Sequence, residues 1–149
     1  MKKEIANSFT HLKIHTQYSV CEGALKTLDL AKHCKSNKIK AVGLCDSNNL
    51  CGALEFSESI AKSRTQPIIG TQINIQYKNN NGKIPLFAKD LEGYKNLIKL
   101  SSKSFLEIND NEEPHCKLID IESNESQIVV LASDISSVKE AQRLAYIAQ

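Results

Sequence analysis

The sequence lacks the cysteine pattern of a disulfide-bonded protein. Its five cysteines are odd in number, irregularly spaced and include no Cys-x-x-Cys pair. This pattern favours free thiols in a reducing compartment over a disulfide framework. No apolar stretch approaches the roughly 18 to 20 residues of a membrane span, and no signal-peptide core opens the chain. We therefore expect a soluble, cytoplasmic protein with no membrane partner.

The sequence also lacks a strong charge of either sign. Its 19 Lys and Arg residues against 17 Asp and Glu residues give a net charge of +2. The longest basic clusters, Lys2-Lys3 and Lys38 to Lys40, are short, so no basic stripe of the kind that binds a phosphate backbone is present. Composition therefore neither demands nor excludes nucleic acid as a partner.

The composition that is present is that of one globular domain. The chain has 149 residues, of which 41% are hydrophobic and 24% charged. It contains no internal repeat, low-complexity tract or linker, so we expect residues 1–149 to form a single domain without a second one.

The first half of the chain alternates short apolar runs with segments of helical periodicity. Strands are predicted at 9–14, 41–45 and 67–70, because each is an apolar run bounded by polar residues. Helices are predicted between them, with apolar stripes at Leu25, Leu28, Ala31 and Cys34 and at Leu50, Ala53, Leu54 and Ala61. The order β-α-β-α-β predicts an α/β fold with parallel neighbouring strands and right-handed crossovers.

The second half changes pattern. Residues 73–77 alternate apolar and polar side chains, 79–82 form a strong turn signal and 84–88 are apolar again, which predicts a β-hairpin. Asp90 is predicted to cap a helix with a stripe of Tyr94, Leu97, Ile98, Ser101 and Phe105. Residues 107–117 are predicted to form an acidic loop and 127–132 a buried strand. A capping box at Ser137 and Glu140 predicts a final helix.

Polar side chains follow the predicted parallel strands. His15, Asp46 and Gln72 come at or just after strand ends, and the carboxyl ends of parallel strands meet at one edge of a sheet. A lone histidine is more often a hydrogen-bonded structural residue than a metal ligand, and Asp46-Ser47-Asn48 can be a turn and helix cap. Taken by themselves, these spacings leave both interpretations open.

Five segments in the same order give a more specific indication. Together they resemble the polymerase and histidinol phosphatase (PHP) domain of the alpha subunit of bacterial DNA polymerase III. The segments are HLKIHTQYS at 11–19, CEGA at 21–24, DSNNLCGALEF at 46–56, QPIIG at 66–70 and GYKNLIKLSS at 93–102. The last segment resembles the polymerase branch of the family and disfavours a stand-alone histidinol-phosphatase-like enzyme.

The resemblance implies a (β/α) barrel, of which this chain supplies the N-terminal portion and no polymerase palm. It also implies a metal site in which several ligand positions have changed. Family members that bind metal use His-x-His after the first strand, where this chain has Lys13 and His15. The other positions are Glu22 for an aspartate, Asp46-Ser47 for Asp-His, and Gln72 for a glutamate. We therefore expect a degenerate site at Lys13, His15, Glu22, Asp46, Ser47 and Gln72, with no catalytic residue.

Lys13 carries the most specific expectation, because its ammonium has no lone pair for a metal while protonated. We expect it to face the polar mouth of the barrel and to pair with Asp46 or Glu22, replacing a cation electrostatically. A thiolate site from Cys21, Cys45 and Cys51 is the alternative to their use as packing residues.

Two functions remain open at this point. The resemblance implies a structural and interaction role in a replicative polymerase, without a cofactor of its own. The partners would be the proofreading exonuclease subunit, the rest of the polymerase and, through the full-length protein, DNA. The alternative is an active metal-dependent phosphoesterase or 3′–5′ exonuclease that binds zinc or manganese through His15, Asp46 and Glu22. Such a catalyst needs several ligands and open positions for water.

Overall fold

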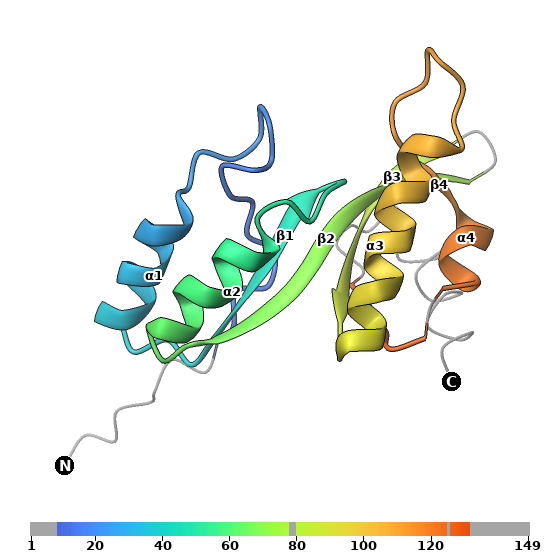
Figure 1. Cartoon of the computed structure of the whole chain (residues 1–149). Coiled ribbons are helices and arrows are strands. Elements are labelled where there is room, and N and C mark those ends of the chain that lie inside the picture. The colour runs from blue at the N-terminus through green and yellow to red at the C-terminus, as the bar shows by residue number, and fades with distance from the viewer. Residues whose placement is uncertain (1–8, 78–79, 125, 132–149) are drawn as a thin grey trace.

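A computed structural model describes residues 9–77, 80–124 and 126–131. Its elements follow the chain as α1 (Thr27–Ser36), β1 (Ala41–Ser47), α2 (Ala53–Lys62), β2 (Gln66–Tyr77), β3 (Asn80–Ala88), α3 (Leu91–Leu106), β4 (Cys116–Lys117), α4 (Leu118–Glu122) and β5 (Ile128–Val130). Figure 1 shows them in chain order. The final helix predicted from Ser137 lies outside the described residues. In the described part of the chain, no helix is long and apolar enough to cross a bilayer.

The strands form one mixed sheet in the order β1-β2-β3-β5, and β4 pairs with β2. β1 and β4 run parallel to β2, whereas β2–β3 and β3–β5 are antiparallel. The predicted α/β class and the hairpin are therefore confirmed. β2 is longer than predicted, because one continuous strand of 12 residues pairs with β1 through its first half and with β3 through its second.

The segment predicted as the first strand, residues 9–14, is not a regular strand. Ile14 makes a single parallel bridge to Leu44, and Gly43 N donates to His11 O at 2.7 Å. Gly43 allows this close approach, because an added Cβ there would lie 2.5 Å from Leu12 O. Residues 11–14 therefore lie against β1 with only local pairing.

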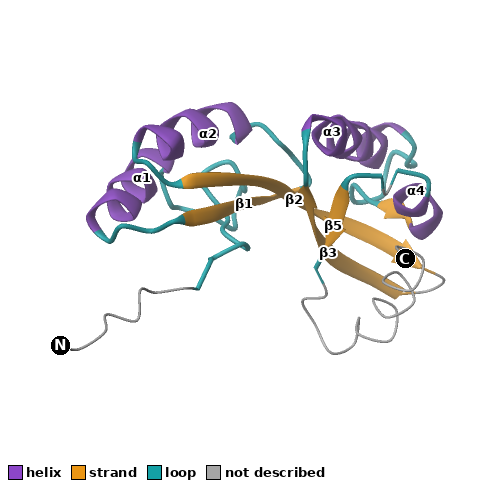
Figure 2. Cartoon of the chain, turned by 90° about the horizontal axis from the view of Figure 1, so that it is seen from below, coloured by secondary structure: helices purple, strands orange, loops and turns teal. Residues whose placement is uncertain are grey.

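Two apolar clusters make up the core. One joins α1, α2 and β1 through Leu30, Val42, Leu44, Phe56 and Ile60. The other joins α3 and α4 to the strands β2, β3, β4 and β5. It includes Ile73, Leu86, Leu97, Leu100 and Ile121. In Figure 2, α2 and α3 both lie over the same face of the sheet.

The faces that the helices turn to the core match the predicted stripes only in part, at Cys34, Ala53 and Leu97. α1 buries Thr27, Leu30 and Cys34, whereas Leu28 is exposed. α2 buries Ala53, Phe56 and Ile60, and α3 buries Leu97 and Leu100 together with smaller residues. Ile98 and Phe105, predicted to be part of the core stripe of α3, are exposed. The predicted cap of α3 is confirmed, because Asp90 Oδ1 accepts from Gly93 N at 2.9 Å.

Three other expectations need correction. The predicted 107–117 loop ends in β4, and α4 follows it directly. The predicted buried strand at 127–132 is the short edge strand β5, in which only Ile128 is buried. The segment Asp46-Ser47-Asn48 does not cap α2, because the N-cap residue of that helix is Gly52.

Candidate functional site at the strand ends

Asp46 is the centre of a buried hydrogen-bond network at the end of β1. Its carboxylate is fully buried and accepts from Thr16 N at 2.6 Å, Thr16 Oγ1 at 2.7 Å and Ser19 Oγ at 2.6 Å. Its carbonyl oxygen accepts from Thr71 Oγ1 at 2.7 Å on the neighbouring strand. A buried carboxylate needs such partners, because burying it without them is costly. Asp46 therefore fastens residues 16–19 to β1 and β2.

Glu22 forms a second cluster beside this network. Lys83 Nζ donates to Glu22 Oε1 at 2.7 Å, and Ser47 Oγ donates to Glu22 Oε2. His15 Nδ1 lies 3.8 Å from the same carboxylate and 3.3 Å from Ser19 Oγ. The hydrogen bond from Lys83, followed by that from Ser47, lowers the pKa of Glu22. Glu22 is thus held as an anion that an ammonium neutralises.

The predicted ion pair of Lys13 is wrong. Lys13 is exposed, and in the described ranges its ammonium is in no ion pair with a carboxylate. The alternation of 11, 13 and 15 holds only in a regular strand, and residues 9–14 do not form one. Lys83, from β3, takes the place beside Glu22 that the sequence had given to Lys13.

The other predicted site residues lie on or near β1 and β2 but differ in burial. Ser47 pairs with Gln72 across β1 and β2. Gln72 is buried and its Oε1 has no hydrogen-bond partner in the described structure. Cys45 is buried, and burial raises the pKa of its thiol to about 12, whereas Cys21 and Cys51 are exposed. Within residues 9–77, 80–124 and 126–131, no three His, Cys, Asp or Glu side chains gather closely enough to hold a metal ion.

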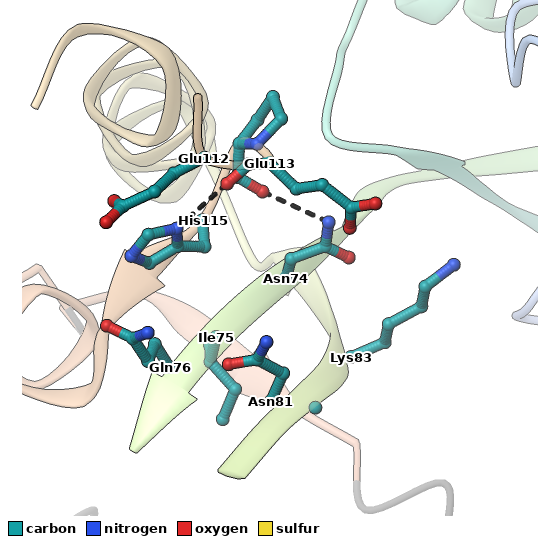
Figure 3. Close-up of a pocket in the computed structure, with 10 residues that line it drawn as sticks. Asn74, Ile75, Gln76, Asn81, Lys83, Glu112, Glu113 and His115 are labelled. Carbon is teal, nitrogen blue, oxygen red and sulfur yellow. Dashed lines mark hydrogen bonds between the residues drawn. The ribbon is translucent and has the colours of Figure 1, made fainter. Parts of the chain in front are cut away.

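A polar pocket has Lys83 among its lining residues, as Figure 3 shows. It has a volume of about 310 Å³ and lies between the β2–β3 hairpin and residues 112–115. Asn74 Nδ2 donates to Pro114 O at 3.0 Å, which fixes the loop against β2. Lys83 lines the pocket and also reaches Glu22, so the pocket opens beside the ion pair.

Sequence reasoning missed the partners of the two carboxylates. Thr16 and Ser19 lie one and four residues after His15, but their contacts with Asp46 span 30 and 27 residues. For Lys83 a sequence signal existed in the hairpin, whose observed register pairs Lys83 with Asn74. Asn74 is two residues from Gln72, so strand alternation places Lys83 on the same face as Gln72.

The comparison with protein families identifies this arrangement. Residues 11–145 match the PHP domain. This chain belongs to the PHP domain family. The PHP match covers all six predicted site residues, and it extends beyond the resemblance seen in residues 9–106.

The curated relatives described here are both DNA polymerase III alpha subunits. The chain is 41% identical over 108 residues to DNA polymerase III subunit alpha of Helicobacter pylori, which covers 67% of this chain and 9% of that protein. It is 42% identical over 115 residues to the Rickettsia conorii subunit, covering 76% of this chain and 10% of that protein. The chain thus spans about a tenth of the length of the curated relatives it matches.

Among solved structures, a proposed metal-dependent phosphoesterase from Bifidobacterium adolescentis resembles the fold, with a TM-score of 0.50 and 17% sequence identity. The match covers 64% of this chain and 32% of that one. At this identity the likeness concerns the fold alone.

Proposed function

We propose that this chain is the N-terminal PHP portion of a bacterial DNA polymerase III alpha subunit and acts there as a structural and interaction domain. The identities of 41% and 42% to subunits of that name support the parent protein. In this proposal the mixed sheet and its helices form part of a (β/α) barrel. The protein works in DNA replication in the cytoplasm, and the nucleotidyl transfer belongs to the rest of the polymerase.

The observation that carries the structural role is the state of the two carboxylates. Asp46 accepts three hydrogen bonds from Thr16 and Ser19, and Glu22 is paired with Lys83. A divalent cation would have to compete with these donors and with an ammonium held beside Glu22. The Oε1 atom of Gln72 has no hydrogen-bond partner and is an oxygen that a metal can bind. It is uncharged, however, and one such ligand is not enough for a metal site. These residues do not fit the zinc or manganese of metal-binding PHP domains.

In place of a metal, the chain's own residues hold the strand ends together. Asp46 joins β1 to residues 16–19, and Glu22 joins the following turn to β3 through Lys83. We propose that this fixed edge supports the contacts that the PHP portion makes with the rest of the polymerase and with the proofreading exonuclease subunit. DNA is then a partner through the full-length protein.

An activity assay tests this proposal. The purified chain is incubated with manganese or zinc and either bis(p-nitrophenyl) phosphate or a 3′-labelled single-stranded DNA. We expect turnover at background, because one histidine and two occupied carboxylates cannot both hold a metal and leave a position for water. Asp110→Ala, which removes an exposed carboxylate that makes none of the cluster's hydrogen bonds, is the matched control. Turnover that His15→Ala and Asp46→Ala abolish, and Asp110→Ala leaves unchanged, would establish the phosphoesterase or exonuclease alternative.

A further inference from the structure

The polar pocket of Figure 3 is built on the face of the β2–β3 hairpin that the core does not use. On β2 the core takes Ile75, so its neighbours Asn74 and Gln76 point to the opposite face of the sheet. The register pairs them with Lys83 and Asn81 of β3. Side chains directly opposite each other in an antiparallel pair are neighbours. Three carboxamides and one ammonium group therefore form the floor of the pocket.

The wall of the pocket is a segment, residues 112–115, that is fastened to its surroundings at several points. Pro114 O accepts from Asn74 Nδ2 at 3.0 Å, and His115 N donates to Ser104 O of α3 at 3.1 Å. β4 follows directly and pairs with β2. The floor and the wall are thus held in place by the chain itself. They border a volume of about 310 Å³, at the lower end of the range for small-ligand sites.

The groups that remain available in this pocket are mostly hydrogen-bond acceptors. The amide nitrogen of Asn74 is used in holding the wall, so its Oδ1 is left to accept. His115 Nδ1 lies 2.8 Å from Glu113 O. Because a carbonyl can only accept, Nδ1 carries the proton and Nε2 is an acceptor in the neutral ring. Gln76 and Asn81 are exposed, and each offers a carbonyl oxygen beside its NH2 group. A ligand rich in N–H donors would satisfy more of these groups than one rich in acceptors.

The charges of the lining add to this preference. The lining contains one lysine and two glutamates. Lys83 Nζ is paired with Glu22 Oε1 at 2.7 Å. Hydrogen bonds from Asn109, first from its side chain and then from its backbone, hold the pKa of Glu112 below its usual value, so Glu112 is an anion that already has a partner. In the described ranges the carboxylate of Glu113 is in no ion pair. Glu113 is therefore the charge that an incoming ligand would neutralise.

Charges next to the pocket do not reverse this balance. Asp110 and Lys117 flank the wall on either side along the chain, and both are exposed. They have opposite signs, and neither lines the pocket. The pocket therefore stays acidic at neutral pH. A phosphate or carboxylate group would be repelled there, whereas a cation would be attracted.

We propose that this pocket binds a guanidinium group, carried either by an arginine of a partner protein or by a small free molecule. A guanidinium is a planar cation with five N–H donors and no acceptor. Two of its donors can pair with the carboxylate of Glu113, and the others match the carbonyl oxygens of the floor. A lysine ammonium has only three donors and no planar fork, so it fits this lining less well. Guanidinium binding here depends on neither the parent protein nor the role proposed for the strand ends.

NMR titration tests the proposal. The whole isotope-labelled chain is titrated with Nα-acetyl-L-arginine methylamide, which presents the side chain as a protein does, and with agmatine, a free guanidinium compound. Both should shift the amide signals of the residues that line the pocket, and the tighter of the two identifies the source of the group. The citrulline analogue of the first probe has nearly the same shape without the charge, and it should shift these signals little. The lysine analogue should bind more weakly.

Three variants place binding at the pocket. Glu113→Gln should weaken the arginine probe about tenfold, as loss of a charged hydrogen-bond partner does. Asp110→Asn removes the same charge from the same loop, but outside the lining, and should change the affinity little because salt screens it. Asn81→Asp adds a carboxylate to the floor and should tighten binding. All three side chains are exposed, so these effects do not depend on repacking.

The proposal is overturned if the arginine probe causes no shift up to its limit of solubility, if the citrulline analogue acts like it, or if Glu113→Gln and Asp110→Asn have the same effect. It is also overturned if inorganic phosphate or an oligothymidylate shifts the same signals more strongly, because an anion would then be the preferred ligand.

Discussion

Lys83 Nζ lies 2.7 Å from Glu22 Oε1, although 61 residues separate the two in sequence. The pair joins β3 to the turn that follows the Asp46-bound segment, and Ser47 and His15 approach the same carboxylate. A positive charge is thus supplied to the strand-end cluster by the protein itself.

Replacing Lys83 by methionine should raise the pKa of Glu22 towards its ordinary value of 4.5, because the largest cause of its lowering is the hydrogen bond from Lys83. A group with a lowered pKa stabilises the fold above its unfolded pKa, and this contribution is lost as pH falls through the folded pKa. Both side chains are partly exposed, so we expect a loss of only about 0.2 to 1 kcal/mol at neutral pH. Carboxyl-carbon NMR titration measures the pKa, and Lys99→Met is the control.

Asp46→Ala should destabilise the fold by about 2 to 4 kcal/mol, because it leaves the buried donors of Thr16 and Ser19 without an acceptor. Thr16→Val removes one of these donors and should cost less. Urea unfolding followed by circular dichroism gives both values. A loss for Asp46→Ala no larger than that for the exposed Asp110→Ala would show that the network contributes little.

Gly43→Ala should destabilise by about 1 to 3 kcal/mol, as overpacking does, because the added Cβ would lie 2.5 Å from Leu12 O. The strain should displace residues 11–14, so amide hydrogen exchange there should become faster. Gly82→Ala is the matched control, since its added Cβ would meet its nearest atom, Ile75 Cγ1, at 3.7 Å. Equal effects of both alanines would mean that residues 11–14 do not lie against β1.

Two of the five thiols should react quickly with Ellman's reagent at pH 8 in the native chain. Cys21 and Cys51 are exposed, whereas Cys34, Cys45 and Cys116 are buried. Burial raises the pKa of Cys45 to about 12 and that of Cys116 to about 11, so few reactive thiolates form there. The remaining three should react only in denaturant, and mass spectrometry of the labelled peptides identifies them. Fast labelling of Cys45 would contradict the described core.

The sequence predicted where helices and strands lie better than it predicted which side of each helix is buried. Strong local signals, such as the turn between β2 and β3 and the cap of α3 at Asp90, suffice to place a hairpin and a helix start. The buried side of α3 could not be predicted as well, because Ile98 and Phe105 fit an apolar stripe as regularly as Leu97 and Leu100 do. Only the position of the sheet decides which stripe is covered.

For the candidate site, the sequence placed Asp46, Ser47 and Gln72 on neighbouring strand ends, and the pairing of β1 with β2 brings them together. It could not place Lys13, since residues 9–14 read as a strand but make only one bridge. It also could not show that Lys83 reaches Glu22, because that contact depends on how the hairpin lies against a distant turn. Partners far apart in sequence are fixed by tertiary packing, not by local pattern.

Metal content tests the central claim, that Lys83 and hydroxyl donors replace a metal at the strand ends. The purified chain is dialysed against zinc or manganese, then metal-free buffer, and analysed by elemental mass spectrometry, with thermal unfolding recorded in parallel. Less than a tenth of an equivalent and an unchanged melting temperature are the expected results. A ligand at 100 times its dissociation constant would stabilise the fold by about 2.7 kcal/mol. About one metal per chain with such a stabilisation, lost in Asp46→Ala but not in Asp110→Ala, would contradict the account.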